Sequence, residues 1–324
     1  MPYDVITLGE TMIRLTPPGW NRLESTESLE VHVGGSESNT AVGLARLGRR
    51  VAWLSRLTSN AMGHLIANKL ASQKVDTSHI VWTDQDRIGT YYLERGCAPR
   101  NTQVIYDRRD SAMSHMTPED LSPALFQSKG ARVFHTTGIT LGISEASART
   151  AFHAAQLAKQ SGWMVSFDLN YRAKLWSPSA CRASAEAFMK LADLIFMPIR
   201  DARNIFGLQE HSPESVLQTL GRMHPQATLV MTMGQEGSMA RSVDGCIHSE
   251  NAFQAVEVDR LGGGDAFSSG FLHAMLDDKP PKECLRWGNA VASLKYSIPG
   301  DLPIVDLAQV VALVDGNRSQ GIVR

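Results

Sequence analysis

From residue 117 onward, apolar segments of strand length alternate with segments of helical periodicity. The strand-like segments include RVFHTT, WMVSFDLN, DLIFMP and TLVMTMG, and helical patterns such as SARTAFHAAQLAKQSG stand between them. Because parallel strands need a long crossover connection, this order predicts a mostly parallel sheet with helices on both faces. Ligands on such sheets bind beyond the carboxyl ends of the strands. We therefore expect an α/β fold with its site at that edge.

Residues 79–110 depart from this alternation. Three short strand-like segments, HIVWT, TYYLE and QVIYD, are separated by polar or Gly/Pro turns such as DQDR and RGCAPRN, which predicts a small antiparallel sheet. Further strand-like segments lie at Ile13–Leu15 and Val31–Val33. We expect one α/β domain over residues 1–324, with a β-lid formed by segments of about 12–33 and 79–112.

Three consecutive glycines, Gly262, Gly263 and Gly264, stand directly before Asp265 at the start of a helical pattern. Glycine tolerates positive φ and lets a ligand approach the backbone, while a helix N-terminus presents free N–H groups and a partial positive charge. Together they form a site suited to phosphate. The free amides should also keep the Asp265 carboxylate ionised, as a proton acceptor must be. An Asp N-cap on a glycine-rich turn explains these residues equally well.

Residues 259–265 resemble the C-terminal signature of the ribokinase-like (PfkB) carbohydrate kinases, whose usual form is D-T-x-G-A-G-D. The segment here is D-R-L-G-G-G-D, with Arg260 where Thr is commonest and Gly263 where Ala is. The competing phosphate-binding patterns, GxxxxGK[ST] and GxGxxG after a strand, are absent from the sequence. The resemblance implies that the amides of Gly262 to Asp265 form an anion hole, and that Asp265 is the catalytic base for the accepting sugar hydroxyl.

A second segment, GGSESNTAVGLARLG, resembles the N-terminal signature of the same family. Gly34 and Gly35 would let a sugar lie close to the chain. The hydroxyl-binding groups at the helix start would be Ser36, Glu37, Ser38 and Asn39, although alone they fit an N-cap cluster better. The resemblance covers residues 3–315 and implies a ribokinase-like three-layer α/β/α sandwich with a mostly parallel central sheet and a small β-sheet lid.

Three further segments resemble the 2-keto-3-deoxygluconate kinases of this family. They imply substrate contacts from Tyr91, Tyr106 and Arg108 in the lid segment, from Arg172 in SFDLNYRAKLW and from Asp301 in SIPGD. Arginine binds a carboxylate through two N–H groups, so this arginine pair suits a sugar acid, whereas a neutral hexose needs none. Solvated surface arginines and core tyrosines are the structural alternative.

The nucleotide side is less distinctive. TMGQEGS follows an apolar strand, so Thr232, Gly234 and Gly237 form either a phosphate- and ribose-facing turn or a plain hairpin turn. By resemblance, the ATP site is lined by this turn, the glycine run (Gly262, Gly264), Asn170 and Asn289. The expected cofactors are ATP and Mg²⁺.

The family usually carries N-x-x-E after a strand, and its polar groups help to hold Mg²⁺. In MPIRDARNIFG, Ile199 and Ala202 take these positions and offer no oxygen ligand, while Asp201, one residue short, could compensate. Because Mg²⁺ in kinases keeps several waters and few protein ligands, the change need not abolish activity. No residue can be assigned as a metal ligand from the sequence.

Composition argues against several other classes. A net charge of −1 gives no basic field for nucleic acid, and no apolar run is long enough to span a bilayer. MPYDVITLGE lacks a basic start, so we expect no signal peptide. Four widely spaced cysteines indicate reduced thiols in a cytoplasmic protein. An exposed edge of the lid sheet could pair with another subunit, so we expect a homo-oligomer.

These features predict an ATP-dependent kinase that phosphorylates the terminal hydroxyl of a sugar acid, foremost 2-keto-3-deoxygluconate, to give its 6-phosphate. Its partners would be that sugar acid and ATP. One alternative is a kinase for another sugar, such as fructose, ribose or a related keto-deoxy acid. The other is a non-catalytic sugar- or nucleotide-binding protein on the same fold, which only the altered N-x-x-E segment favours.

Overall fold

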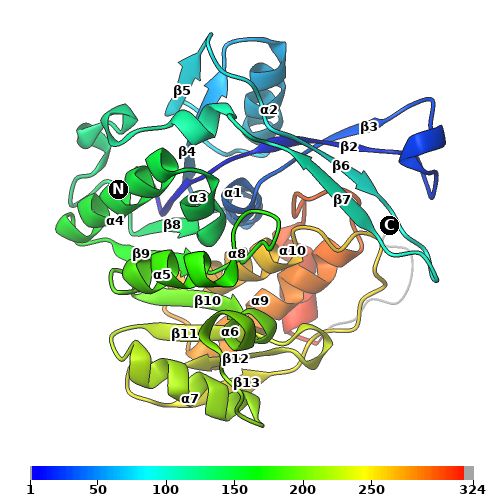
Figure 1. The fold of residues 1–324 in the computed structure, drawn as a ribbon. Helices are drawn as coiled ribbons and strands as arrows, with labels where there is room; N and C mark the ends of the chain where they lie inside the picture. Colours follow the sequence, from blue (N-terminus) through cyan, green and yellow to red (C-terminus); the bar gives the residue numbers. More distant parts are fainter. Residues whose placement is uncertain (1, 317–324) are drawn as a thin grey trace.

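The centre of the molecule is a nine-stranded sheet with the order β13-β12-β11-β10-β9-β8-β1-β4-β5, seen in the computed structural model, which describes residues 2–316 (Figure 1). Seven neighbouring strands, from β11 to β5, are parallel, and β12 and β13 complete one edge in antiparallel fashion. The strands are β1 (Val5–Leu8), β4 (Val51–Thr58), β5 (Ile80–Thr83), β8 (Val133–Thr137), β9 (Met164–Asp168), β10 (Leu194–Pro198), β11 (Thr228–Thr232), β12 (Ser238–Arg241) and β13 (Ile247–Glu250).

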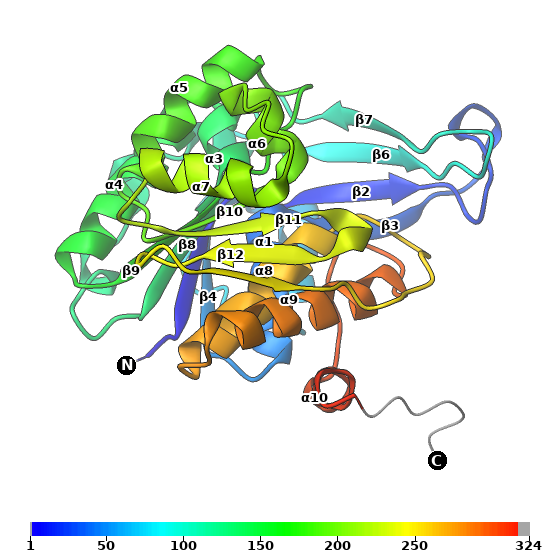
Figure 2. The same cartoon turned by 90° about the horizontal axis from the view of Figure 1, so that it is seen from below.

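Helices cover both faces of this sheet, as Figure 2 shows from below. On one face lie α3 (Gly138–Ile143), α4 (Glu145–Gln160), α5 (Pro178–Met189), α6 (Ile199–Phe206) and α7 (Pro213–Met223). On the other lie α1 (Ser36–Arg46), α2 (Ala61–Ala71), α8 (Gly263–Leu276) and α9 (Pro281–Tyr296), followed by α10 (Leu307–Val314). The predicted three-layer α/β/α arrangement is therefore confirmed.

The apolar strand segments are buried from both sides, which explains why they read as continuous rather than alternating runs. Phe134 and Phe167 belong to the hydrophobic cluster under α3–α7, whereas Trp53 and Phe196 belong to the cluster under α1, α8 and α9. All four side chains are almost completely buried. This two-sided core holds the carboxyl ends of the parallel strands in place.

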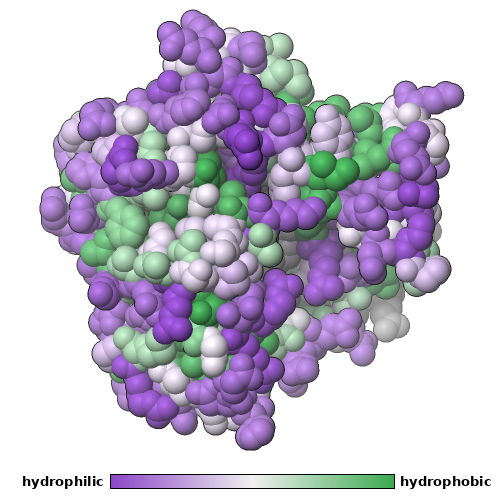
Figure 3. Space-filling view, in the orientation of Figure 1, coloured by the Kyte–Doolittle hydropathy of each residue, from purple (hydrophilic) through white to green (hydrophobic). Residues whose placement is uncertain are grey.

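A second sheet, which we call the lid, has the order β3-β2-β6-β7 and projects from the same edge (Figures 1 and 2). Its strands are β2 (Met12–Thr16), β3 (Glu30–Gly34), β6 (Thr90–Glu94) and β7 (Gln103–Asp107). The lid is mixed rather than antiparallel, because β2 and β6 are parallel. In the space-filling view the surface is hollowed between the lid and the central sheet with its helices, which we call the body (Figure 3).

The strand at Ile80–Thr83 was expected in the lid, and this expectation was wrong. It pairs in parallel with Ser55–Thr58 at the end of β4 and forms an edge of the large sheet. The helix α2 lies between the two strands, so β4, α2 and β5 form an ordinary β–α–β unit. Within residues 2–316, no helix is long and apolar enough to cross a membrane.

Candidate active site

The glycine run forms a turn that opens directly into α8. Gly262 is the N-cap, with φ of 78°, and any Cβ there would collide with the carbonyl of Asp301, so only glycine fits. A Cβ at Gly264 would meet no heavy atom within 4 Å among the described residues. Within that part of the chain, the amides of Gly264 and Asp265 also have no acceptor. The turn thus combines open space with free N–H groups at a helix N-terminus, which suits an anion.

The side chain of Asp265, in the first turn of α8, accepts two hydrogen bonds from α1. Ser36 Oγ donates to Asp265 Oδ1 at 2.6 Å, and Asn39 Nδ2 donates to Oδ2 at 2.7 Å. Asn170, which follows β9 with φ of 39°, donates to Ser36 Oγ at 2.7 Å. Four predicted residues, from three separate sequence segments, therefore lie together. Their catalytic and binding roles stay predictions.

The environment of Asp265 differs from the expectation that helix amides keep its carboxylate readily ionised. Burial raises the pKa of Asp265, and the hydrogen bonds from Ser36 and Asn39 and the charge of Arg172 oppose this shift only in part. The reason is that the side chain is shielded from water on nearly all sides. A carboxylate with a raised pKa is a better proton acceptor, so the change favours general-base chemistry.

Two further buried carboxyls lie near Asp265: Asp168 was not predicted as a site residue, whereas Glu37 was expected to bind sugar hydroxyls. Burial, followed by the charge of Asp265, raises the pKa of Asp168 well above its usual value. Glu37 faces the protein interior, where its Oε1 accepts hydrogen bonds from Thr137 and Thr140, and burial raises its pKa to about 7. Glu37 is therefore part of the packing behind the site rather than a group for sugar hydroxyls.

Two other members of the N-terminal signature, Ser38 and Gly35, shape the local backbone. Ser38 Oγ accepts from Thr11 at 2.6 Å and donates to the carbonyl of Gly35 at 3.0 Å. A Cβ at Gly35 would collide with the carbonyl of Glu10. These contacts fix the sharp entry into α1, and they leave Ser36 and Asn39 as the residues that reach Asp265.

Asp301 and Tyr91 lie together, but each already has a protein partner. The Tyr91 hydroxyl donates to Asp301 Oδ1, and Arg14 Nη1 donates to Asp301 Oδ2 at 2.6 Å. Gly34 packs against both Asp301 and Tyr91, leaving no room for a side chain. Sequence reasoning missed Arg14, although a charged residue inside the apolar strand MIRLT was a usable signal.

Arg108 and Tyr106 lie on the lid side of the site. The Arg108 guanidinium is 5.9 Å from the centre of the Tyr106 ring, and its Nη2 donates to Glu10. Glu10 also accepts from Ser111. Neither Glu10 nor Ser111 was predicted, because a single acidic residue after a strand carries no distinctive pattern. The positive charge of Arg108 is thus balanced inside the protein.

Arg172 differs from Arg108 because it forms no ion pair within the described residues. It is half-buried, its Nη1 donates to the carbonyl of Tyr171 at 3.3 Å, and its charge acts on both Asp265 and Asp168. Its guanidinium is therefore available to an anion beside Asp265.

The altered N-x-x-E segment begins α6. Ile199 packs against the core and Ala202 is fully buried. Both side chains are hydrocarbon, so neither supplies an oxygen ligand for a metal ion. Asp201 lies close enough to raise the pKa of Asp168, and its Oδ2 accepts from the amide of Tyr171 at 3.2 Å. Among the described residues, no group of three or more His, Cys, Asp or Glu side chains is arranged to hold a metal ion.

The residues predicted for the nucleotide lie at the neighbouring strand ends. Thr232 ends β11, and Gly234 and Gly237 adopt positive φ in the turn that leads to β12. Asn289 on α9 bonds Ser238 and the carbonyls of Glu250 and Asn251, so its amide joins the helix to the sheet. The turn and α8 border the same edge of the sheet.

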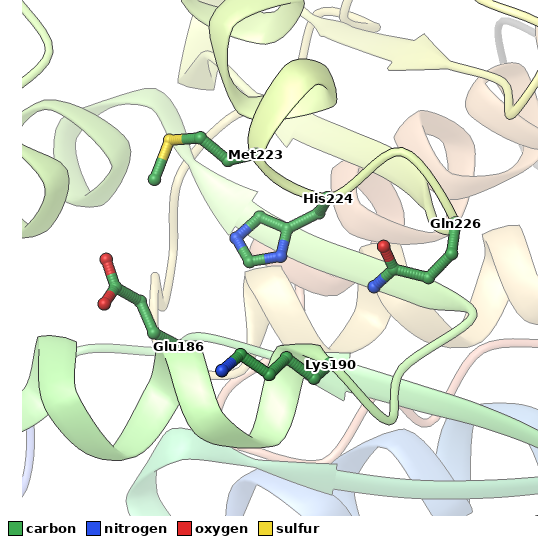
Figure 4. A pocket seen from close by; sticks show the side chains of 5 residues that line it. All are labelled: Glu186, Lys190, Met223, His224 and Gln226. Atoms are coloured by element: carbon green, nitrogen blue, oxygen red, sulfur yellow. The ribbon is translucent and has the colours of Figure 1, made fainter.

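A pocket of about 300 Å³ lies elsewhere, lined by side chains that include Glu186, Lys190 and His224 (Figure 4). These residues belong to the ends of α5 and α7 and to the segment before β11, on the side where the parallel strands begin. Since the predicted site lies where the strands end, this pocket is not part of it.

Comparison with known proteins agrees with this geometry. Residues 3–303 match the family model described as pfkB family carbohydrate kinase. A 2-dehydro-3-deoxygalactonokinase of Haloferax volcanii is 37% identical over 316 residues, covering 98% of each chain. A 2-dehydro-3-deoxygluconokinase of Bacillus subtilis is 29% identical over 308 residues, covering 93% of this chain and 92% of its own. The crystal structure of 2-dehydro-3-deoxygluconokinase from Thermotoga maritima has a TM-score of 0.91 at 29% identity, covering 97% of this chain and all of the other. The chain therefore belongs to the pfkB family of carbohydrate kinases.

Proposed function

We propose that this protein transfers the γ-phosphoryl group of ATP to the terminal hydroxyl of a six-carbon 2-keto-3-deoxy sugar acid. The substrate is 2-keto-3-deoxygluconate or its galactonate isomer, since similar proteins are named for the corresponding 2-dehydro-3-deoxy acids. The observation that carries the proposal is Asp265, which is buried beside the free amides of the glycine turn and held by Ser36 and Asn39.

In the proposed reaction, Asp265 accepts the proton of the attacking hydroxyl. Ser36 and Asn39 fix the direction of its two oxygens, so the base is oriented before the substrate arrives. The amides of Gly264 and Asp265 would stabilise the negative charge that spreads over the transferring phosphoryl group. These parts together supply positioning, proton removal and charge stabilisation.

A sugar acid is favoured over a neutral sugar because Arg172 lies beside Asp265 without an ion-pair partner in residues 2–316. A guanidinium can donate two hydrogen bonds to one carboxylate. Arg108 would add a second contact if it exchanges Glu10 for the substrate. The aromatic rings of Tyr91 and Tyr106, whose centres are 5.9 Å apart, would then border the sugar.

The carboxyl groups around the site fit a Mg²⁺ ion that is held mainly by nucleotide phosphates and water. Asp168 is buried with a raised pKa and has no ion-pair partner within residues 2–316, and Asp201, which pairs with Arg200 at 3.1 Å, lies near it. Mg²⁺ would neutralise phosphate charge when bound. Asp168 is the residue we propose near its water shell, and Asp201 would take part of the role of the missing Glu.

We also propose that the chain forms one α/β domain whose lid closes over the sugar and excludes water.

The exposed apolar side chains of Val31 and Ile105 on the lid support a homo-oligomer. Four cysteines without disulfide partners support a cytoplasmic location.

The test is product identification from ATP, Mg²⁺ and each of the two isomeric acids. ADP release is followed by a coupled assay, and the sugar phosphate is examined by proton-coupled ³¹P NMR. Transfer to the terminal CH₂OH predicts a triplet, because two protons neighbour the phosphate. A doublet would place the phosphate on a secondary carbon, and absence of any ester with ATP still bound would favour the non-catalytic alternative.

A further inference from the structure

We propose that Arg14 is a positioning residue that links the lid to the anion-binding glycine turn. Arg14 lies on lid strand β2 and is completely buried. Its two terminal nitrogens bind two carboxylates of the body, Asp259 at 2.7 Å and Asp301 at 2.6 Å. Its Nε donates to Thr16 Oγ1 at 2.8 Å, which fixes the plane of the guanidinium. The inference rests on the proposed function, because it assigns a role within that reaction.

The first carboxylate, Asp259, controls the start of the glycine turn. Asp259 Oδ1 accepts from the amide of Leu261 at 3.2 Å, and Oδ2 accepts from the amide of Gly300 at 3.0 Å. The side chain therefore ties its own turn to the neighbouring 300–302 loop. Arg14 binds the same Oδ2 atom, so its position affects the carboxylate that holds the amide of Leu261, one residue before Gly262.

The second carboxylate, Asp301, forms the opposite wall of the turn. Its carbonyl lies against Gly262 so closely that no side chain would fit there. Its carboxylate is held by Arg14 and by Tyr91, both from lid strands. One lid arginine thus fixes both sides of the turn whose amides face the phosphate.

The body holds the same turn by a separate contact. The buried ammonium of Lys295, on α9, donates to the carbonyl of Asp259 at 3.2 Å and to that of Ile298 at 3.1 Å. This contact does not involve the lid. Loss of Arg14 therefore leaves the turn attached to the body. On the lid side it leaves Tyr91 on Asp301 and the more distant Arg95, 3.7 Å from Asp259. It removes the one side chain that binds both carboxylates, so the amides should remain present but lose their alignment.

The test compares Arg14→Lys with the wild-type enzyme. A single ammonium group cannot bind both carboxylates with two nitrogens, although it keeps the charge. We expect kcat to fall about a hundredfold, as small misplacements at a reacting centre do, while the KM for the sugar acid changes less than about threefold. The matched control is Arg87→Lys, because Arg87 forms an exposed lid ion pair with Asp107, and it should retain wild-type kcat.

Thr16→Val provides a milder variant in case Arg14→Lys does not fold. It removes only the hydroxyl that orients Arg14 Nε, so kcat should fall about three- to tenfold, and Thr16→Ser should restore it. A readout without turnover is the affinity for ADP with aluminium fluoride, measured by calorimetry. The variants should lose most of the affinity gain that aluminium fluoride gives, yet bind ADP alone normally.

Two results would overturn the inference. One is a folded Arg14→Lys enzyme with wild-type kcat and a wild-type aluminium fluoride effect. The other is equal loss of ADP affinity and melting temperature without a specific loss of the aluminium fluoride effect, which would indicate a structural role only. If the wild-type protein bound ADP and aluminium fluoride but phosphorylated no sugar acid, the proposed substrate would fail while the Arg14 test would still give an answer.

Discussion

The body and the lid present acidic residues to the same site, but they differ in how those charges are balanced. On the body side, Asp265, Asp168 and Glu37 are buried with raised pKa values, and within residues 2–316 none of them forms an ion pair with arginine or lysine. On the lid side, the carboxylates that contact the lid are paired with arginines, as Asp301 is with Arg14.

This difference in charge pairing predicts that the two sides respond differently to substrate. The body side is already assembled for chemistry and is short of positive charge, which a substrate-bound Mg²⁺ would supply. The lid side is electrically satisfied, so an anionic substrate must exchange partners with residues such as Glu10 to reach Arg108. Loss of Asp265 should therefore affect turnover most, whereas loss of the Glu10–Arg108 pair should mainly change substrate affinity.

The largest effect is expected for Asp265→Asn. The amide keeps the shape, and its single oxygen can still accept from Ser36 or from Asn39. It cannot accept a proton, so kcat should fall about a thousandfold or more. Sugar-acid binding, measured by calorimetry, should change little. The control is Asp278→Asn at the other end of the same helix, where the side chain is exposed and the positive φ suits Asn. Retained turnover in Asp265→Asn would show that Asp265 is not the catalytic base.

The pH profile sharpens the same point. Because burial raises the pKa of Asp265, kcat/KM should rise with pH along an acid limb whose midpoint lies above the ordinary value of 3.8. An acid limb at or below that value would contradict the buried environment of the base.

The next effect concerns substrate charge. Arg172→Met should raise the KM for the sugar acid roughly ten- to a hundredfold, which corresponds to loss of charged hydrogen bonds. Steady-state kinetics should show a much smaller change for any neutral sugar that is accepted. Arg222→Lys, an exposed change on α7, serves as the control. Equal losses for charged and neutral substrates would mean that Arg172 does not bind the carboxylate.

Glu37→Gln tests how much stability the protein loses when the buried carboxyl of Glu37 ionises. The folded pKa of Glu37 is about 7 against 4.5 ordinarily, so the folded state keeps a proton that the unfolded state has released. The contribution of Glu37 to the free energy of unfolding is fully present below the unfolded pKa and is lost as the pH rises through about 7. The variant should remove this loss, which amounts to about 3 kcal/mol.

The measurement is urea unfolding of wild type and Glu37→Gln at pH 5, 7 and 8.5. The two curves of unfolding free energy should diverge as the pH rises, with the variant the more stable above pH 7. Glu145→Gln, at an exposed position, should follow the wild type. Parallel curves for Glu37→Gln would show that this carboxyl titrates normally.

The smallest effect is expected for Glu10→Gln on the lid side. The change weakens the hold on Arg108 and should lower the KM for the sugar acid about threefold, because the competing ion pair is removed. Glu24→Gln, an exposed lid residue, should leave KM unchanged. A rise in KM would instead mean that Glu10 orients Arg108 for the substrate.

Much of the fold could be predicted from the sequence, because the layered core leaves a clear mark on it. The alternating strand and helix segments predicted the parallel sheet correctly, since buried strands must be apolar throughout. The segment at Ile80–Thr83 was misassigned because short apolar strands look alike whichever sheet they join.

The site was predicted less completely for a different reason. Ser36, Asn39 and Asp265 could be found because they lie at helix starts beside glycines, which are local features. Arg14 and Glu10 were missed, since their roles depend on partners far away in the sequence, such as Asp301; the charge inside MIRLT marked Arg14 as unusual but did not identify its partners. Pairings of this kind arise only when the lid meets the body.

The measurement that tests the central claim most directly is kcat/KM of the wild-type enzyme for a panel of sugars. The panel contains 2-keto-3-deoxygluconate, 2-keto-3-deoxygalactonate, fructose and ribose, with a blank without sugar and several Mg²⁺ concentrations. We predict that one or both keto-deoxy acids are preferred over the neutral sugars by about a hundredfold, the value of a bidentate charged contact. Equal turnover of neutral sugars, or no turnover of either acid while ATP binds, would contradict the account.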